Sequence, residues 1–233
     1  MLDLHWAPTT NGIKILLFIE EAGLAHRLIP VNLIAGEQFQ SEFLKLSPNN
    51  KVPVLVDHEP AGSMQPAVIF ESGAILLYLA DKLGRFIPTD VHGRVEVLKW
   101  LFWQVSGLGP MSGQLSHFLD YPHHGEQVPY AINRYLNEVG RLYAVLNKQL
   151  SDRDYVAGDY SIADMACFGF VVYYARARQN LAELPHVARW LRRMNERPAV
   201  TRTMSHVPST KAFEIPEESW QILFGQTQAN VQP

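Results

Sequence analysis

The stretch SPNNKVPVLVD, residues 47–57, decides the fold of this chain. Residues 54–56 are apolar and β-branched or leucine, which predicts a short buried strand that ends at Asp57. Pro53 stands just before this strand, where the missing N–H of proline disturbs no ladder. X-Pro bonds lose most of their preference for trans, so a cis bond can form after Val52. Val52 would then direct its N–H and C=O away from its own sheet, and an extended peptide could pair with them as an added strand.

A second stretch, AVIFESGAILLYLA at residues 67–80, predicts an anion-binding helix start. Residues 67–70 predict another strand, and residues 73–80 a helix that ends near Gly84. Ser72 is a good N-cap, so we expect free N–H groups and the helix dipole to favour a carboxylate there. The acidic Glu71 beside it could hold an ammonium group. The alternative is structural: Glu71 and Ser72 only start a helix, and Pro53 only turns the chain.

The overall composition describes an ordinary globular protein. Of 233 residues, 47% are hydrophobic and 18% are charged, enough for one large domain or two small ones. The formal net charge of −3 gives no electrostatic reason to expect nucleic acid or a membrane as partner. One cysteine fits a reducing compartment. Because the start has no signal-peptide pattern and no apolar run approaches a membrane span, we expect a soluble cytoplasmic protein.

The first 83 residues predict the element order β-α-β-α-β-β-α. Residues 2–6 predict the first strand and residues 13–22 a helix that stops at Gly23. Residues 28–33 predict an edge strand because they contain Pro30, and residues 41–46 predict a short helix. The first strand, helix and strand then form a right-handed parallel unit, and the last two strands form a hairpin.

The rest of the chain predicts helices only. We expect a linker at residues 84–92, an all-helical domain at residues 93–210 and a C-terminal extension at residues 211–233. The helical segments are residues 95–105, 129–150, 162–178 and 187–197. Ser161 and Asp164 have the spacing of a capping box at the start of one of these helices. Residues 218–224 predict a last docking helix, followed by a loose polar tail.

Several of these motifs together resemble the cytosolic glutathione transferases. They are the NKVP turn at residues 50–53, ESGAI at residues 71–75 and DYSIAD at residues 159–164. The resemblance covers about residues 1–205 and implies a thioredoxin-like N-terminal domain followed by a helical-bundle domain. Within the family, PTTNG at residues 8–12 and GEQF at residues 36–39 look most like the bacterial nu class of glutathione-dependent disulfide-bond reductases.

The resemblance implies that Thr9 and Asn11 face the glutathione sulfur. Many members of the family use Tyr, Ser or Cys at this turn, but none of these stands between Leu2 and Gly12. A hydroxyl or amide that donates a hydrogen bond favours thiolate over thiol. The alternative is that Thr9 and Asn11 only cap the following helix.

The same resemblance assigns the residues that bind glutathione, which would be a co-substrate. Val52, next to Pro53, pairs by its backbone with the cysteinyl residue, and Glu71 with Ser72 holds the γ-glutamyl head. Gln38 and Lys51 meet the glycine carboxylate. Arg134 resembles a helical-domain arginine that reaches a glutathione carboxylate, or else it is only a solvated helix residue.

The implied function is reduction of disulfide bonds through a bound glutathione thiolate, in a homodimer. The alternatives are conjugation of glutathione to electrophiles, cleavage of aryl ethers, and binding of glutathione by a regulatory protein without catalysis. We expect no metal: His117, Asp120, His123 and His124 lack helical spacing and predict a solvated loop. Cys167 stands in an apolar helix and predicts a buried, inert thiol.

Overall fold

The computed structural model describes residues 1–120, 127–208 and 216–227, without the side chains of Glu217 and Glu218. The chain divides into two compact units, which are described separately here. The first joins Met1–Ile75 to Thr203–Pro233, and the second is Leu76–Arg202. The limits expected from the sequence, at residues 83, 93 and 210, stay predictions.

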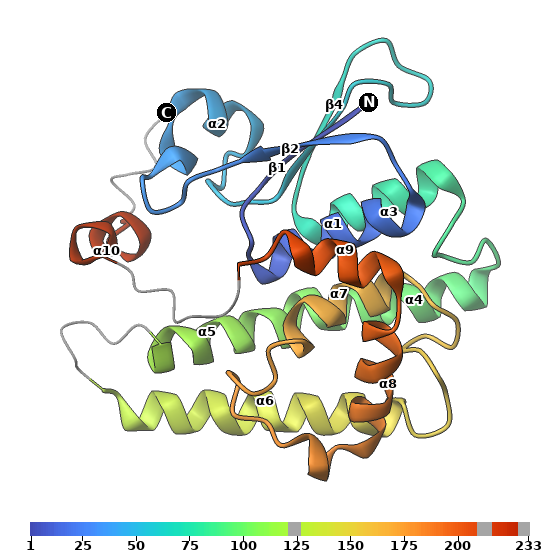
Figure 1. The fold of residues 1–233 in the computed structure, drawn as a ribbon, viewed down its shortest axis with the longest axis vertical. Helices are drawn as coiled ribbons and strands as arrows, with labels where there is room; N and C mark the ends of the chain where they lie inside the picture. The colour runs from blue at the N-terminus through green and yellow to red at the C-terminus, as the bar shows by residue number, and fades with distance from the viewer. Residues whose placement is uncertain (121–126, 209–215, 228–233) are drawn as a thin grey trace. The chain divides into compact units, whose positions relative to one another are not determined.

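The first unit contains a four-stranded mixed sheet in the order β2-β1-β3-β4 (Figure 1). The strands are β1 (Leu2–Trp6), β2 (His26–Pro30), β3 (Val54–Asp57) and β4 (Ala67–Phe70). β1 runs parallel to β2 and antiparallel to β3, and β3 forms the expected antiparallel pair with β4. The prediction of a thioredoxin-like sheet with β2 at its edge is therefore confirmed. The bounds of β2 were wrong, because its pairing with β1 starts at His26 opposite Leu2.

Short helices complete the first unit. They are α1 (Thr10–Ala22), η1 (Glu37–Phe39), α2 (Ser41–Leu46), the start of α3 (Ser72–Leu83), the end of α9 (Pro198–Ser205) and α10 (Glu217–Phe224). α1 stops at Gly23 as predicted, because this glycine takes a left-handed φ of 68° and its N–H bonds to the carbonyl of Ile19. Seven residues in a row, Ile13 to Ile19, are buried, so α1 is enclosed on all sides.

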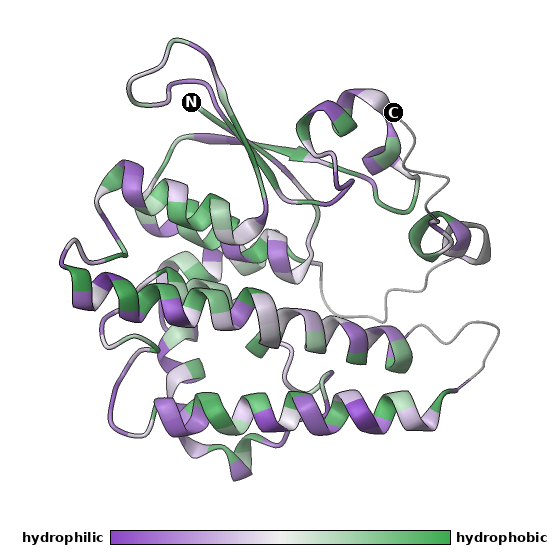
Figure 2. Cartoon of the chain, turned by 180° about the vertical axis from the view of Figure 1, so that it is seen from behind, coloured by the Kyte–Doolittle hydropathy of each residue, from purple (hydrophilic) through white to green (hydrophobic). Residues whose placement is uncertain are grey.

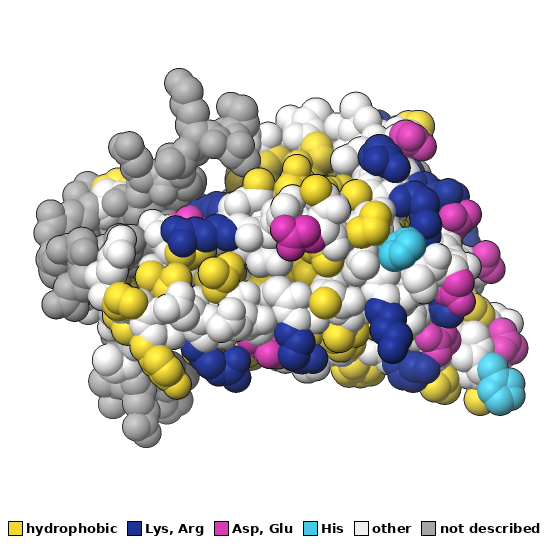
Figure 3. Space-filling model, turned by 90° about the horizontal axis from the view of Figure 1, so that it is seen from below, with side chains coloured by type: hydrophobic (Ala, Val, Ile, Leu, Met, Phe, Trp, Pro, Cys, Tyr) yellow, Lys and Arg dark blue, Asp and Glu magenta, His cyan; other side chains and the backbone are white. Residues whose placement is uncertain are grey.

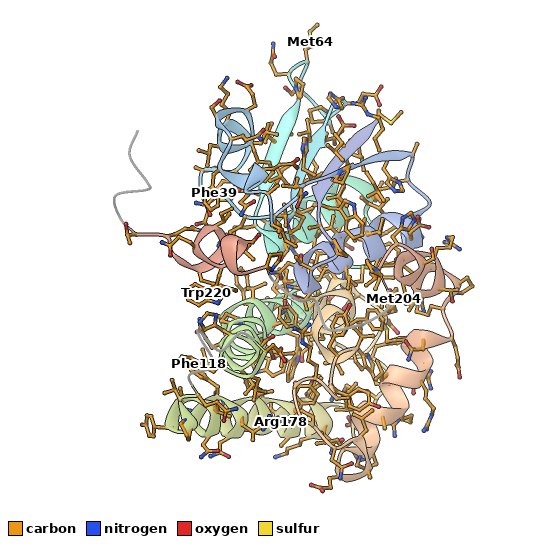
Figure 4. All side chains as sticks on the ribbon, turned by 60° about the vertical axis from the view of Figure 1, so that its left-hand side comes forward. Phe39, Met64, Phe118, Arg178, Met204 and Trp220 are labelled. Carbon is orange, nitrogen blue, oxygen red and sulfur yellow. The ribbon has the colours of Figure 1, made fainter. Side chains whose placement is uncertain are left out.

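The C-terminal helix α10 packs against the segment that precedes η1 within the first unit, as predicted for a docking helix. A β-carbon on Gly36 would lie 3.2 Å from a methyl group of Ile222. Gly36 has a φ of 77°, a conformation in which glycine avoids strain, and it precedes η1. Figure 4 labels Phe39 of η1 and Trp220 of α10. α10 thus docks on the segment that contains Gln38.

Within its described residues the second unit is helical, as expected, apart from two isolated β-bridges at residues 155–159. Its helices include α4 (Val91–Trp103), the π-turn η2 (Gln104–Leu108), α5 (Gly109–Asp120), α6 (Pro129–Gln149), α7 (Ile162–Val171), η4 (Leu181–Glu183) and α8 (Pro185–Asn195). The capping box is confirmed: Ser161 caps α7, and buried Asp164 accepts hydrogen bonds from Ser161 N–H and the Trp190 indole. No helix within the described residues is long and apolar enough to cross a membrane.

The structure corrects the prediction around α5. His117 and Asp120 belong to this helix instead of a solvated loop, whereas His123 and His124 lie outside the described residues. The sequence GLGP at residues 107–110 has the composition of a helix break. The π-helix η2 leads directly into α5: the Gly109 N–H bonds to the Gln104 carbonyl, and Pro110, which has no N–H, follows it. α7 is also shorter than expected and ends at Val171.

The long helix α6 shows how the second unit forms its core. Val139, Leu142, Tyr143 and Leu146 are buried at the spacing of one helix face. Figure 2 shows the matching alternation of hydrophilic and hydrophobic residues along α6. On the face drawn in Figure 3, Lys and Arg side chains alternate with Asp and Glu. α6 itself carries an exposed ion pair between Arg141 and Glu138, at 2.7 Å.

A charged cluster links three neighbouring strands of the sheet, β2, β1 and β3. Arg27 of β2 donates to both carboxylate oxygens of Asp3 on β1, and His58, which follows β3, lies 2.8 Å from one of them. Asp3 is only 5% exposed. The hydrogen bond from Arg27, together with His58, lowers the pKa of Asp3 to about 2, although burial acts in the opposite direction. The ionised form of Asp3 therefore stabilises the folded protein.

We expect Asp3→Asn to lower stability most above about pH 5, where Asp3 is ionised in both the folded and the unfolded chain. The difference from the parent should shrink as the pH falls from about 4 towards 2, because Asp3 is then protonated in the parent as well. Urea unfolding midpoints measured across this pH range test the expectation. Asp154→Asn, which breaks an exposed pair with Arg193, is the control and should change little. A loss of stability that does not depend on pH would contradict the role of the Asp3 charge.

Candidate functional site

The turn before α1 fixes the position of Asn11. Thr9 is the N-cap of α1, and its hydroxyl oxygen accepts a hydrogen bond from the Gly12 N–H at 3.0 Å. Gly12 lies against the preceding strand end, where an added β-carbon would come within 2.3 Å of the Ala7 carbonyl oxygen. Only glycine allows this close approach, so the turn holds Asn11 at the helix start.

The loop of residues 47–53 forms a second wall. The Ser47 hydroxyl donates to the Lys51 carbonyl at 3.0 Å and accepts from the Lys51 N–H at 3.3 Å, which closes the loop. The Val52–Pro53 peptide bond is cis, as the sequence allowed. Within the described part of the chain, the N–H and C=O of Val52 make no hydrogen bond. Both groups can therefore pair with an extended ligand.

The start of α3 forms the third wall and corrects one prediction. The Glu71 carbonyl accepts from the Ile75 N–H at 2.9 Å, so Glu71 holds the N-cap position and Ser72 is the first helical residue. Glu71 has a left-handed φ of 71°. Such a conformation costs a residue other than glycine about 1–3 kcal/mol, and it is concentrated at functional sites. The helix start still offers free N–H groups to an anion.

These three walls enclose a pocket of about 280 Å³. Six of the residues predicted from the sequence line it: Asn11, Lys51, Val52, Pro53, Glu71 and Ser72. Sequence reasoning missed three more, Ser47, Asn49 and Phe70. The exposed Lys51 and Glu71 bring opposite charges to the pocket, which suits a ligand that is both a carboxylate and an amine.

Three other predicted residues do not line this pocket. The Thr9 hydroxyl oxygen caps α1, as the alternative interpretation of the sequence required. The hydrogen of this hydroxyl can still be donated to another group. Gln38 lies in η1, is 4% exposed, and donates to the Leu33 carbonyl at 3.2 Å. Arg134 belongs to α6 in the second unit, where it is exposed and lies 4.0 Å from Glu138. The assignments of these residues to glutathione stay predictions.

A buried lysine behind the pocket was not recognised in the sequence. Lys14 of α1 is 1% exposed, and its Nζ donates to the Ser72 hydroxyl oxygen at 3.3 Å. The Ser72 hydroxyl in turn donates to Asn11 Oδ1 at 3.4 Å. The signal was available, because a lysine within a helix that is apolar on all sides must be buried and needs a polar partner.

Neither a metal cluster nor a protein thiol is found at the pocket. Across residues 1–120, 127–208 and 216–227, no group of three or more His, Cys, Asp or Glu could hold a metal ion. Cys167, the single cysteine of the sequence, is fully buried in α7 of the second unit, as predicted. Any reactive sulfur in the pocket must therefore come from a ligand.

Comparison with known proteins identifies close relatives over most of the chain. Two family profiles match, the glutathione S-transferase N-terminal domain at residues 4–81 and the C-terminal domain at residues 123–198. Disulfide-bond oxidoreductase YfcG of Escherichia coli (strain K12) is 52% identical over 206 residues, which are 88% of this chain and 94% of that protein. Disulfide-bond oxidoreductase YghU of the same strain is 41% identical over 216 residues, covering 86% and 73%.

A solved structure supports the same relationship. It is a glutathione transferase from Burkholderia graminis with two glutathione molecules bound per subunit. It is 38% identical to this chain, has a TM-score of 0.81, and the match covers 90% of this chain and 88% of that one.

We expect Gly12→Ala to destabilise the protein by about 1–3 kcal/mol, because the new methyl group would overlap the Ala7 carbonyl. The matched control is Gly113→Ala in α5, where a β-carbon meets nothing within 4 Å. That variant should be neutral or about 0.5–1 kcal/mol more stable, since alanine favours a helix interior. Urea unfolding of both variants gives the comparison, and equal stabilities would show that the turn tolerates a side chain.

Proposed function

Because the chain belongs to the glutathione transferase family, we propose that it is a glutathione-dependent disulfide-bond oxidoreductase. The observation that carries this proposal is the composition of the pocket. An asparagine amide faces it, and the turn from Leu2 to Gly12 offers no Tyr, Ser or Cys. Such a site can stabilise a bound thiolate but cannot itself exchange electrons. The names of the relatives YfcG and YghU support the same reaction.

Glutathione binds along the three walls. The backbone N–H and C=O of Val52 pair with the cysteinyl residue in the manner of an added strand. The γ-glutamyl carboxylate meets the N–H groups at the start of α3, and its ammonium meets the Glu71 carboxylate. Lys51 neutralises the glycine carboxylate. Opposite charges at the two ends of the pocket fix the direction of the tripeptide and direct its sulfur toward Asn11.

The reaction is a sequence of two thiol–disulfide exchanges. The bound thiolate attacks one sulfur of the substrate disulfide, which forms a mixed disulfide and releases the other sulfur as a thiolate. A second glutathione thiolate then attacks the glutathione sulfur of that mixed disulfide. This step releases the second substrate thiol and forms oxidised glutathione, so two glutathione molecules supply the two electrons. The Asn11 amide stabilises the attacking thiolate, and no step needs a metal.

The assay that tests this function compares two substrates with the same enzyme. Reduction of a small model disulfide by glutathione should be clearly faster than the uncatalysed reaction and than conjugation to an aryl halide. Faster turnover of the aryl halide or an aryl ether would favour the transferase alternative. Tight binding of glutathione without turnover of any of these substrates would favour a regulatory protein.

We propose that the active protein is a homodimer in the cytoplasm. This reducing compartment keeps both glutathione and a free cysteine in their thiol forms. α4 supports the dimer because it exposes an apolar stripe of Val91, Val95 and Phe102, which are 73%, 50% and 60% exposed. A second copy would cover this stripe.

Phe102→Glu should therefore convert the dimer to a monomer, because a charge within an apolar interface is costly. Sedimentation analysis of parent and variant measures the change. Tyr130→Glu, which alters another exposed aromatic residue at the start of α6, serves as the control. A parent that sediments as a monomer would refute the assembly.

We expect Asn11→Ala to bind glutathione normally but to reduce disulfides about tenfold more slowly or worse. Losing the amide donor should raise the pKa of the bound thiol by about one unit or more. Steady-state rates and calorimetric binding of glutathione distinguish the two effects. Asn195→Ala, at the exposed end of α8, is the control. If Asn11 is only structural, Asn11→Ala will lower stability and leave the rate per folded molecule unchanged.

A further inference from the structure

A buried chain of hydrogen bonds leads from α1, through α3, to the pocket. It begins at Lys14 Nζ, passes through the Ser72 hydroxyl and ends at Asn11 Oδ1, with distances of 3.3 Å and 3.4 Å. Lys14 and Ser72 are 1% and 8% exposed, whereas Asn11 lines the pocket. The chain connects the inside of the protein to the residue nearest the expected sulfur.

The chemistry of the three groups fixes which group donates and which accepts in each of these hydrogen bonds. A lysine nitrogen that bonds a hydroxyl oxygen acts as donor, and the serine hydroxyl has only one hydrogen of its own. Because Ser72 accepts from Lys14, its hydrogen is directed to the oxygen of Asn11. The amide oxygen is then engaged, and the NH₂ group is what Asn11 presents to the pocket. A flipped amide would instead present an oxygen, which would repel a thiolate.

We infer that Lys14 is a positioning residue that acts through Ser72 to hold the Asn11 amide with its NH₂ group toward the glutathione sulfur. This inference rests on the proposed function and adds a residue to it. Lys14 never touches the substrate. Its part is to fix which of two nearly isosteric groups, amide nitrogen or amide oxygen, meets the sulfur.

This role is compatible with binding of glutathione at the same helix start. Backbone N–H groups of the first turn of α3 can hold the γ-glutamyl carboxylate. The Ser72 hydroxyl can therefore stay with Asn11 when the ligand is bound. Recognition of the glutamyl head and orientation of the amide then use different atoms of the same residue.

The test is Lys14→Met, which keeps an unbranched side chain of similar length in the buried site and removes the donor. The pH titration of bound glutathione, followed by thiolate absorbance, should show a thiol pKa about one unit higher than in the parent. The rate of disulfide reduction should fall about tenfold at neutral pH and recover at alkaline pH. Affinity for S-methylglutathione, which has no ionisable thiol, should not change. Lys45→Met, which removes an exposed lysine of α2, is the control.

A double-mutant cycle identifies the route of the effect. If Lys14 acts through Asn11, adding Lys14→Met to Asn11→Ala should cause no further rise in the thiol pKa. An equal rise in both backgrounds would overturn the inference, as would an unchanged pKa in Lys14→Met. Weaker binding of S-methylglutathione would show instead that Lys14 serves the carboxylate. A parent that binds no glutathione would refute the proposed function itself.

A measurement on the parent protein keeps the inference testable if Lys14→Met does not fold. The side-chain amide protons of Asn11, assigned by their loss in Asn11→Ala, should shift in the NMR spectrum with the titration of the bound thiol. Amide protons that ignore this titration would show that the NH₂ group does not face the sulfur.

Discussion

The hydrogen bonds of Ser72 are the constraint on which the site depends. Through them the start of α3 is joined to two residues of α1, Lys14 and Asn11, that precede it by 58 and 61 positions in the chain. The first turns of two helices therefore meet at one pocket. In the proposed complex with glutathione, one turn supplies N–H groups for the carboxylate and the other supplies an amide for the sulfur.

Much of this arrangement could be predicted from the sequence because it depends on local chemistry. Short apolar runs marked β3 and β4, and Gly23 marked the end of α1. Pro53 marked the turn that precedes β3, and the position of Val52 there brought its backbone into the predicted site. The resemblance to a family then supplied Thr9 and Asn11, which the residues alone would leave as helix caps.

The features that were not predicted depend on contacts between residues far apart in the sequence. The start of β2 is set by its register with β1, and Glu71 replaces Ser72 as the cap because its carbonyl accepts the Ile75 N–H. α5 continues through a glycine-rich segment because a π-turn precedes it. The apolar run of α1 indicates that Lys14 is buried, but its hydrogen-bond partner, Ser72, lies 58 positions away in the sequence.

The placement of Cys167, sealed within α7, has a consequence for durability. Catalytic cysteines are open to over-oxidation to sulfinic or sulfonic acids, which ends their activity. Here the working sulfur arrives with each ligand and leaves with the product, so oxidative injury would fall on a replaceable small molecule. For the same reason, an alkylating reagent that inactivates thiol enzymes would find no accessible cysteine on this protein.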